Sequence, residues 1–168
     1  MSLSQGQTAF VQSLINFANN DNLNREALAN MRSGLGKKPG EMARVHKYVV
    51  PFLPEHDFAD DWYYLLATLF GQYPVHNPKN TLPDALGSLR SKSDSTETRF
   101  IALLNCHSED LPDHLRHAVS LLKSNDRAFD WFHLFNSLLQ WDHPENFIQK
   151  SWARDFYNPR HDSDHEQA

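Results

Sequence analysis

Lysine and arginine side chains recur in this sequence at positions where several of them could bind one chain of phosphates. From residue 25 to 47, six such cations accompany only two glutamates. Farther along, Arg116 and Lys123 are seven residues apart with Ser120 between them, which places them on one exposed face of an expected helix. Cations at several separate positions suit the repeated phosphates of a nucleic-acid strand, because each phosphate contact releases counterions without reading a base.

Eight cations are candidate phosphate ligands, and the alternative is that they only solvate helix faces, as lysine and arginine ordinarily do. The net charge of −5 also counts against a strongly basic nucleic-acid protein, although the acid is concentrated in residues 55–61 and 161–168. On spacing alone the two interpretations have nearly equal weight. The candidates are Arg32, Lys37, Lys38, Arg44, Lys47, Arg99, Arg116 and Lys123.

Ten histidines and one cysteine raise the question of a metal or catalytic site. His114 and His117 lie one helical turn apart with Cys106 and His107 upstream, but no HExxH, paired CxxC or third ligand at an established spacing accompanies them. Adjacent helical residues point about 100° apart, so Cys106 and His107 would not readily share a hydrogen bond. The acids of 55–61 precede an aromatic helix, whose dipole they would stabilise. We therefore expect no metal site, no cofactor and no enzymatic activity.

The elements that must position these side chains are helices, because apolar residues recur three and four apart and no long two-residue alternation survives. In the helix at 111–124 the buried stripe is expected at Leu115, Ala118, Val119 and Leu122. Pro39 is expected to open one helix, and Asp94 with Glu97 to form a capping box at the start of another. The fold class is all-α, with about eight to nine helices, expected at 5–19, 23–33, 40–50, 60 to about 71, 82–91, 95–106, 111–124, 128–142 and 145–157.

Two small packed helical bundles are the expected organisation, with the boundary in the polar, proline-containing stretch YPVHNPKNTLP. We place an N-terminal lobe at 1–73, a linker at 74–80, a C-terminal lobe at 81–157 and a flexible acidic tail at 158–168. A chain of this size can bury roughly 70% of its unfolded surface. No apolar stretch approaches the ~18 residues of a membrane span, and the first residues lack a secretion signal, so we expect a cytoplasmic protein.

Three segments carry a resemblance to a known family. They are NREALANMRSGLGKKPGEMARVHKYVVPFLP, TRFIALLNCHSEDLPDHLRHAVSLLKS and WFHLFNSLLQWDHPENFIQKSWARDFY. Their order and extent, over most of residues 23–157, closely resemble the CasB family, the small subunit of the type I-E CRISPR Cascade surveillance complex. The most specific parts are an arginine before a proline-containing turn, a YV-PFL ending, an RF-ALL helix, an LR-AV-L helix and a terminal WAR-FY.

The resemblance implies a non-catalytic, all-helical protein that binds nucleic acid without sequence preference. It further implies a ribonucleoprotein with other Cascade subunits, a second copy of this chain, CRISPR RNA, target DNA and the displaced single strand as partners, and no membrane. By position, Arg32 matches the arginine before the turn, Arg99 the one opening RF-ALL, and Arg116 the one within LR-AV-L. Local charge and helix phase add five further candidate phosphate ligands, which are Lys37, Lys38, Arg44, Lys47 and Lys123.

We therefore predict a subunit that stabilises the RNA-paired target and the displaced strand through backbone contacts. The cationic helix face and the 32–47 segment would then form one groove. The alternative is a structural spacer that binds neighbouring proteins with little nucleic-acid contact, in which case changes at Glu55 or Asp57 would disturb assembly more than changes at the arginines. The acidic total charge, and Asn105 and Ser108 where some relatives place arginines, weigh against strong binding by the isolated chain.

Overall fold

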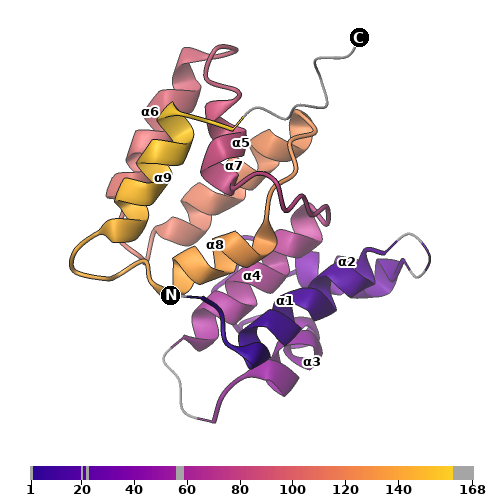
Figure 1. Cartoon of the computed structure of the whole chain (residues 1–168). Helices are drawn as coiled ribbons and strands as arrows, with labels where there is room; N and C mark the ends of the chain where they lie inside the picture. Colours follow the sequence, from indigo (N-terminus) through magenta and orange to yellow (C-terminus); the bar gives the residue numbers. More distant parts are fainter. Residues whose placement is uncertain (1, 20, 22, 56–58, 161–168) are drawn as a thin grey trace.

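A computed structural model describes residues 2–19, 21, 23–55 and 59–160 of the chain, and it is helical throughout (Figure 1). Within those residues there are nine α-helices and two short 3-10 helices, and the single bridge, between His76 and Phe129, extends into no strand. The all-α prediction is confirmed. Asp57 and residues 161–168, part of the predicted acidic tail, lie outside the described residues.

The α-helices are α1 (Gln5–Phe17), α2 (Arg25–Arg32), α3 (His46–Val49), α4 (Asp60–Gln72), α5 (Leu82–Gly87), α6 (Asp94–Asn105), α7 (Leu111–Ser124), α8 (Trp131–Leu139) and α9 (Phe147–Tyr157). The 3-10 helices are Ala43–Val45 and Val50–Phe52, on either side of α3. None of the described helices is long and apolar enough to cross a bilayer.

Two local predictions about helix starts are wrong. The helix expected from residue 40, opened by Pro39, begins only at Ala43, because Gly40 has φ +80°, a left-handed conformation that a helix cannot contain. The cap of α6 is Ser93, whose hydroxyl accepts a hydrogen bond from the Ser95 N–H, and Asp94 is the first helical residue. Ser93, one residue earlier, takes the capping position because its short side chain can accept a hydrogen bond from a free backbone N–H in the first turn of the helix.

A single hydrophobic cluster holds the helices together and contains side chains from all nine. Helix α4 lies in the middle of the fold, where it packs against α2, α7 and α8. Phe10 of α1, Tyr63 of α4 and Phe135 of α8 meet with ring centroids 4.9–5.4 Å apart, so α8 joins the helices of the N-terminal half. The division of the chain into two lobes at 74–80 stays a prediction.

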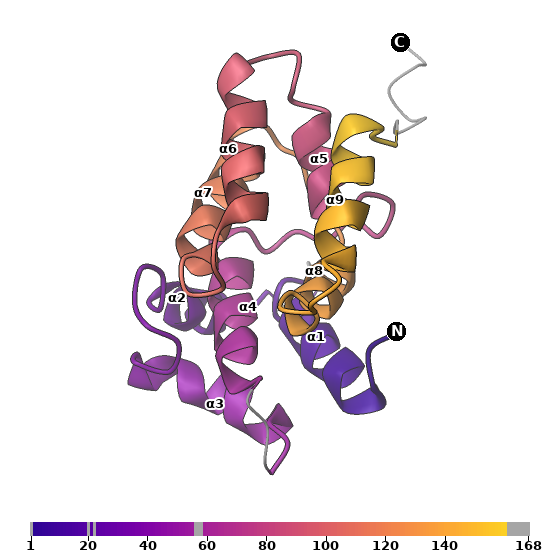
Figure 2. The same cartoon turned by 90° about the vertical axis from the view of Figure 1, so that its left-hand side faces the viewer.

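The other helices pair side by side, α6 with α7 and α5 with α9 (Figure 2). Gly87 permits the close approach of α5 and α9, because a Cβ on this residue would overlap the carbonyl group of Phe156. Gly71 does the same for α4 and α2, since a Cβ on this residue would lie 2.8 Å from the backbone nitrogen of Arg32. The α6–α7 pair is held by other contacts, because α7 packs against α4 and both helices of the pair pack against α5.

Two partly buried histidines are expected to make the stability of this fold depend on pH. Burial lowers the pKa of His133, against the opposing effect of Asp155, Asp130 and Asp84, and its Nδ1 is buried without a hydrogen-bond partner. Burial also lowers the pKa of His76, although Asp130 opposes the shift. The backbone N–H of Trp131 donates to His76 Nδ1 at 3.3 Å, a bond that requires this nitrogen to be unprotonated.

Because both pKa values are lower in the folded chain, the unfolded chain takes up protons first as the pH falls below about 6.5. The free energy of unfolding is therefore expected to be higher at pH 7.5 than at pH 6.0, and urea denaturation at the two pH values measures the difference. His133→Gln should reduce this difference, whereas the same change at exposed His107 should leave it intact. Identical midpoints at both pH values in the unaltered protein would contradict the assignment.

Candidate nucleic-acid interface

The glycine-containing turn after α2 folds against α7 and brings predicted cations from distant parts of the sequence together. Lys37 and Lys38 of the turn and Arg116 of α7 line one cavity of about 200 Å³. Gly36 has φ +74°, and a Cβ placed on it would lie 3.4 Å from Arg116 Nη1, so the turn passes directly over the guanidinium group. Any bulky residue in this left-handed position would be strained, so glycine permits the approach.

Arg116 is partly neutralised by its own helix. Its Nη2 lies 3.3 Å from Asp113 Oδ1, and Glu109 also lines the cavity. The side chain of Arg116 is 38% exposed and that of Asp113 is 72% exposed, so solvent screens the pair and it contributes little stability. A phosphate could therefore compete for the guanidinium group at small cost. The Arg116 Nε is buried without a hydrogen-bond partner, while its backbone carbonyl accepts from Gln72 Nε2 of α4 at 3.2 Å, which fixes the helix position.

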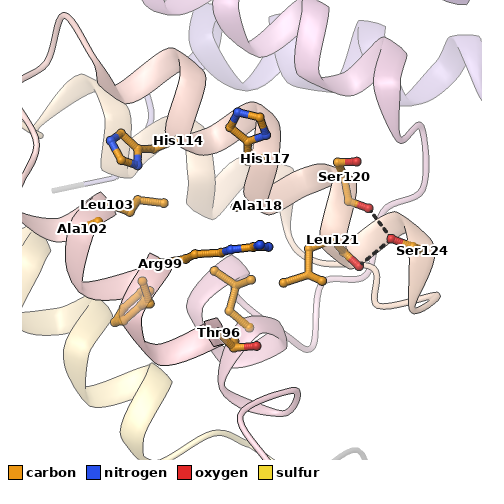
Figure 3. Close-up of a pocket in the computed structure, with 12 residues that line it drawn as sticks. Thr96, Arg99, Ala102, Leu103, His114, His117, Ala118, Ser120, Leu121 and Ser124 are labelled. Carbon is orange, nitrogen blue, oxygen red and sulfur yellow. Dashed lines mark hydrogen bonds between the residues drawn. The ribbon is translucent and has the colours of Figure 1, made fainter. Parts of the chain in front are cut away.

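A larger groove of about 500 Å³ lies between α6 and α7, and we call it the α6–α7 groove. Arg99 extends into it from α6, and His114 and His117 of α7 lie along its border (Figure 3). The residues that line it are Leu86, Thr96, Arg99, Phe100, Ala102, Leu103, His114, His117, Ala118, Ser120, Leu121 and Ser124. None of these described lining residues is acidic, in contrast to the cavity at Arg116.

Helix α7 separates the two cationic sites. Arg116 lines the cavity beside the glycine turn, and His117, the next residue, lines the α6–α7 groove. Consecutive helical residues point about 100° apart, which accounts for the separation. Arg99 therefore lies in a different depression from Lys37, Lys38 and Arg116.

The remaining predicted cations are exposed and line neither depression. Arg32 is the last residue of α2, Arg44 lies in the 3-10 helix before α3, and Lys123 lies in the last turn of α7. Lys47 of α3 has its Nζ 5.1 Å from the ring centroid of Tyr48. Their roles as phosphate ligands stay predictions.

The spacing of His114 and His117 suggests only metal ligands, and nothing in the sequence indicates that they lie beside Arg99. Their spacing of three residues did indicate a shared face, but which neighbour that face meets depends on how α6 crosses α7. Across the described part of the chain, no three histidine, cysteine or acidic side chains gather closely enough to hold a metal ion. Burial and Asp110 raise the pKa of the Cys106 thiol, which donates to the Leu103 carbonyl at 3.1 Å, so this cysteine is a poor nucleophile.

Both the sequence and the fold of this chain match known proteins of one family. Residues 27–157 match the family model described as CRISPR-associated protein Cse2. A curated protein of that description from Thermus thermophilus is 35% identical over 135 residues, 78% of either chain. A crystal structure of CasB from Thermus thermophilus is 32% identical and covers 92% of this chain and 99% of its own, with a TM-score of 0.79.

One further structure is described as a CRISPR RNA-guided surveillance complex. Its matching chain is 22% identical and superimposes with a TM-score of 0.75, covering 91% of this chain and 92% of the matching one. At that level of identity the likeness shows a shared fold alone.

Proposed function

This chain belongs to the CRISPR-associated Cse2 family, which confirms the resemblance to CasB, and we propose that it is a non-catalytic subunit of a CRISPR RNA-guided surveillance complex. In that complex it binds nucleic-acid backbone without reading the sequence. The observation that carries the proposal is the cavity where Lys37, Lys38 and Arg116 converge from separate parts of the chain. The shared fold with a chain of such a complex is consistent with it.

The proposed ligand is the phosphate backbone of the guide RNA–target DNA R-loop and of its displaced strand. Base pairing between guide and target reads the sequence, so the protein needs only positive charge along the strands. The proposed partners are therefore the other subunits of a type I-E Cascade, a second copy of this chain, CRISPR RNA and target DNA. The screened Arg116–Asp113 pair suits such binding, because a phosphate can displace an exposed carboxylate.

A salt series tests the proposal. Purified protein is titrated with a fluorescent single strand at several salt concentrations, alone and after reconstitution with its partner subunits. The logarithm of the affinity is expected to fall linearly with the logarithm of the salt concentration, with a slope of about −2 if the three cavity cations each bind one phosphate of a single strand.

Lys92→Ala is a control for the loss of one positive charge outside the proposed site, because Lys92 is exposed and lies outside both depressions. It should change neither the affinity nor the slope. Binding only in the reconstituted complex would mean that neighbouring subunits complete the cavity. A lack of strand binding in both settings would contradict the proposed function and favour the structural spacer.

A further inference from the structure

We propose that the α6–α7 groove accepts one unstacked nucleobase of the bound strand, enclosed by Arg99, His114 and His117. This inference rests on the proposed function, since it requires that a strand be bound nearby, and it adds a contact to the base where the proposed function has only contacts to phosphate. The occupant is therefore a single-stranded nucleic acid, at a position where its bases are not paired.

The shape and lining of the groove fit a base better than a phosphate. Its volume of about 500 Å³ is in the range of small-molecule sites. Its apolar lining includes Phe100, Leu103 and Leu121, whereas Ser120 and Ser124 are exposed and polar. A phosphate alone would gain nothing from apolar walls. A base has two apolar faces, which can contact the apolar residues, and polar edges, which can contact the two serines.

The charged and aromatic groups around the groove are the types that stack on bases. Single-stranded bases are commonly held on histidine rings and on the plane of an arginine guanidinium. In Figure 3 the Arg99 side chain reaches from α6 across the groove towards Leu121, and His114 and His117 follow one another along α7 on the opposite side. A base in the groove would therefore have groups suited to stacking within reach on both helices.

Electrostatics favour an anionic strand at the same place. No carboxylate lines the groove, and no described carboxylate forms an ion pair with Arg99. Arg99 is exposed, so it is free to contact either the base or its phosphate. The same positive charge opposes a metal cation at His114 and His117, which are the only metal-ligand side chains among the described lining residues.

The test compares two single strands of equal length and charge, one of thymidines and one in which every base is replaced by an abasic residue. The unaltered protein, alone or in the reconstituted complex, is expected to bind the base-containing strand about tenfold more tightly, within the range found for stacking of one base. Ala118→Leu, which fills the groove, and His117→Ala, at an exposed position, should each reduce this ratio towards one. Thermal unfolding checks that both variants remain folded.

Arg116→Ala separates the contribution of the base contact from that of the phosphate contacts. It lies outside the groove and should weaken both strands by the same factor, leaving the ratio unchanged. Equal affinity of the unaltered protein for the two strands would overturn the base site while leaving the proposed backbone binding in place. A preference for bases that survives in both groove variants would also overturn it, because the base would then bind elsewhere. If neither strand binds in either setting, the proposed function fails together with the inference.

Discussion

Replacing Lys37, Lys38 and Arg116 together by glutamine is expected to weaken binding of a single strand about 100-fold near 0.1 M salt. Each phosphate contact to a single strand contributes roughly 0.7 to the salt exponent, so losing three contacts removes about two powers of ten at this concentration. The loss should shrink as salt is added, because counterion release contributes less to binding at high salt. Fluorescence titration at about 0.05, 0.1 and 0.3 M salt measures it.

A charge-matched control is provided by Arg32, Arg44 and Lys47, which are exposed and line neither depression. Changing these three to glutamine removes the same charge from the predicted 32–47 segment without touching the cavity. If the cavity holds the strand, this control loses much less affinity than the cavity variant. Equal losses would mean that the strand responds to the total positive charge of the protein, and the cavity would lose its special role. All the altered side chains are at least partly exposed, so unfolding midpoints should change little.

Trp152→Ala is expected to destabilise the fold by about 3–5 kcal/mol, the usual cost of removing a large aromatic side chain from a core. Trp152 is fully buried in α9, its ring centroid is 5.0 Å from that of Trp141, and its Nε1 donates to Ser137 Oγ of α8 at 3.0 Å. The substitution therefore leaves a cavity between α8 and α9. For a chain of this length the melting temperature should fall by about 6–20 °C, measured by circular dichroism.

Trp152→Phe separates packing from hydrogen bonding at this position. Phenylalanine retains most of the buried ring but cannot donate to Ser137, whose hydroxyl still donates to the His133 carbonyl at 2.9 Å. The loss should therefore be well below that of Trp152→Ala. Tyr157→Ala, at an exposed position of the same helix, should cost less than either. If Trp152→Ala melts within about 2 °C of the unaltered protein, the core contact between α8 and α9 is not as described.

Local sequence patterns were sufficient to predict the helical class and much of the layout along the chain. Helix α7 spans the predicted 111–124, and Leu115, Val119 and Leu122 are buried as their spacing predicts, whereas Ala118 is only partly buried and lines the α6–α7 groove. The spacing of apolar residues within one helix is enough to predict which of its faces is buried. The order of motifs also identified the family. The predicted helix start is wrong at Gly40, where one residue changes the local backbone, and the predicted cap is wrong where Ser93 and Asp94 compete for one position.

The meeting of particular cations, in contrast, became visible only in the folded chain. Helix phase places Arg116 on the exposed side of α7, but nothing in the sequence near it indicates that Lys37 and Lys38 lie across from it. That contact depends on the α4–α7 packing and on the left-handed Gly36, which lets the turn approach the guanidinium. In the same way, the crossing of α6 and α7 places Arg99 beside the two groove histidines and away from Arg116. The physical reason is that a local pattern fixes the face on which a side chain lies, whereas the distance between two faces is set by the core that all the helices share.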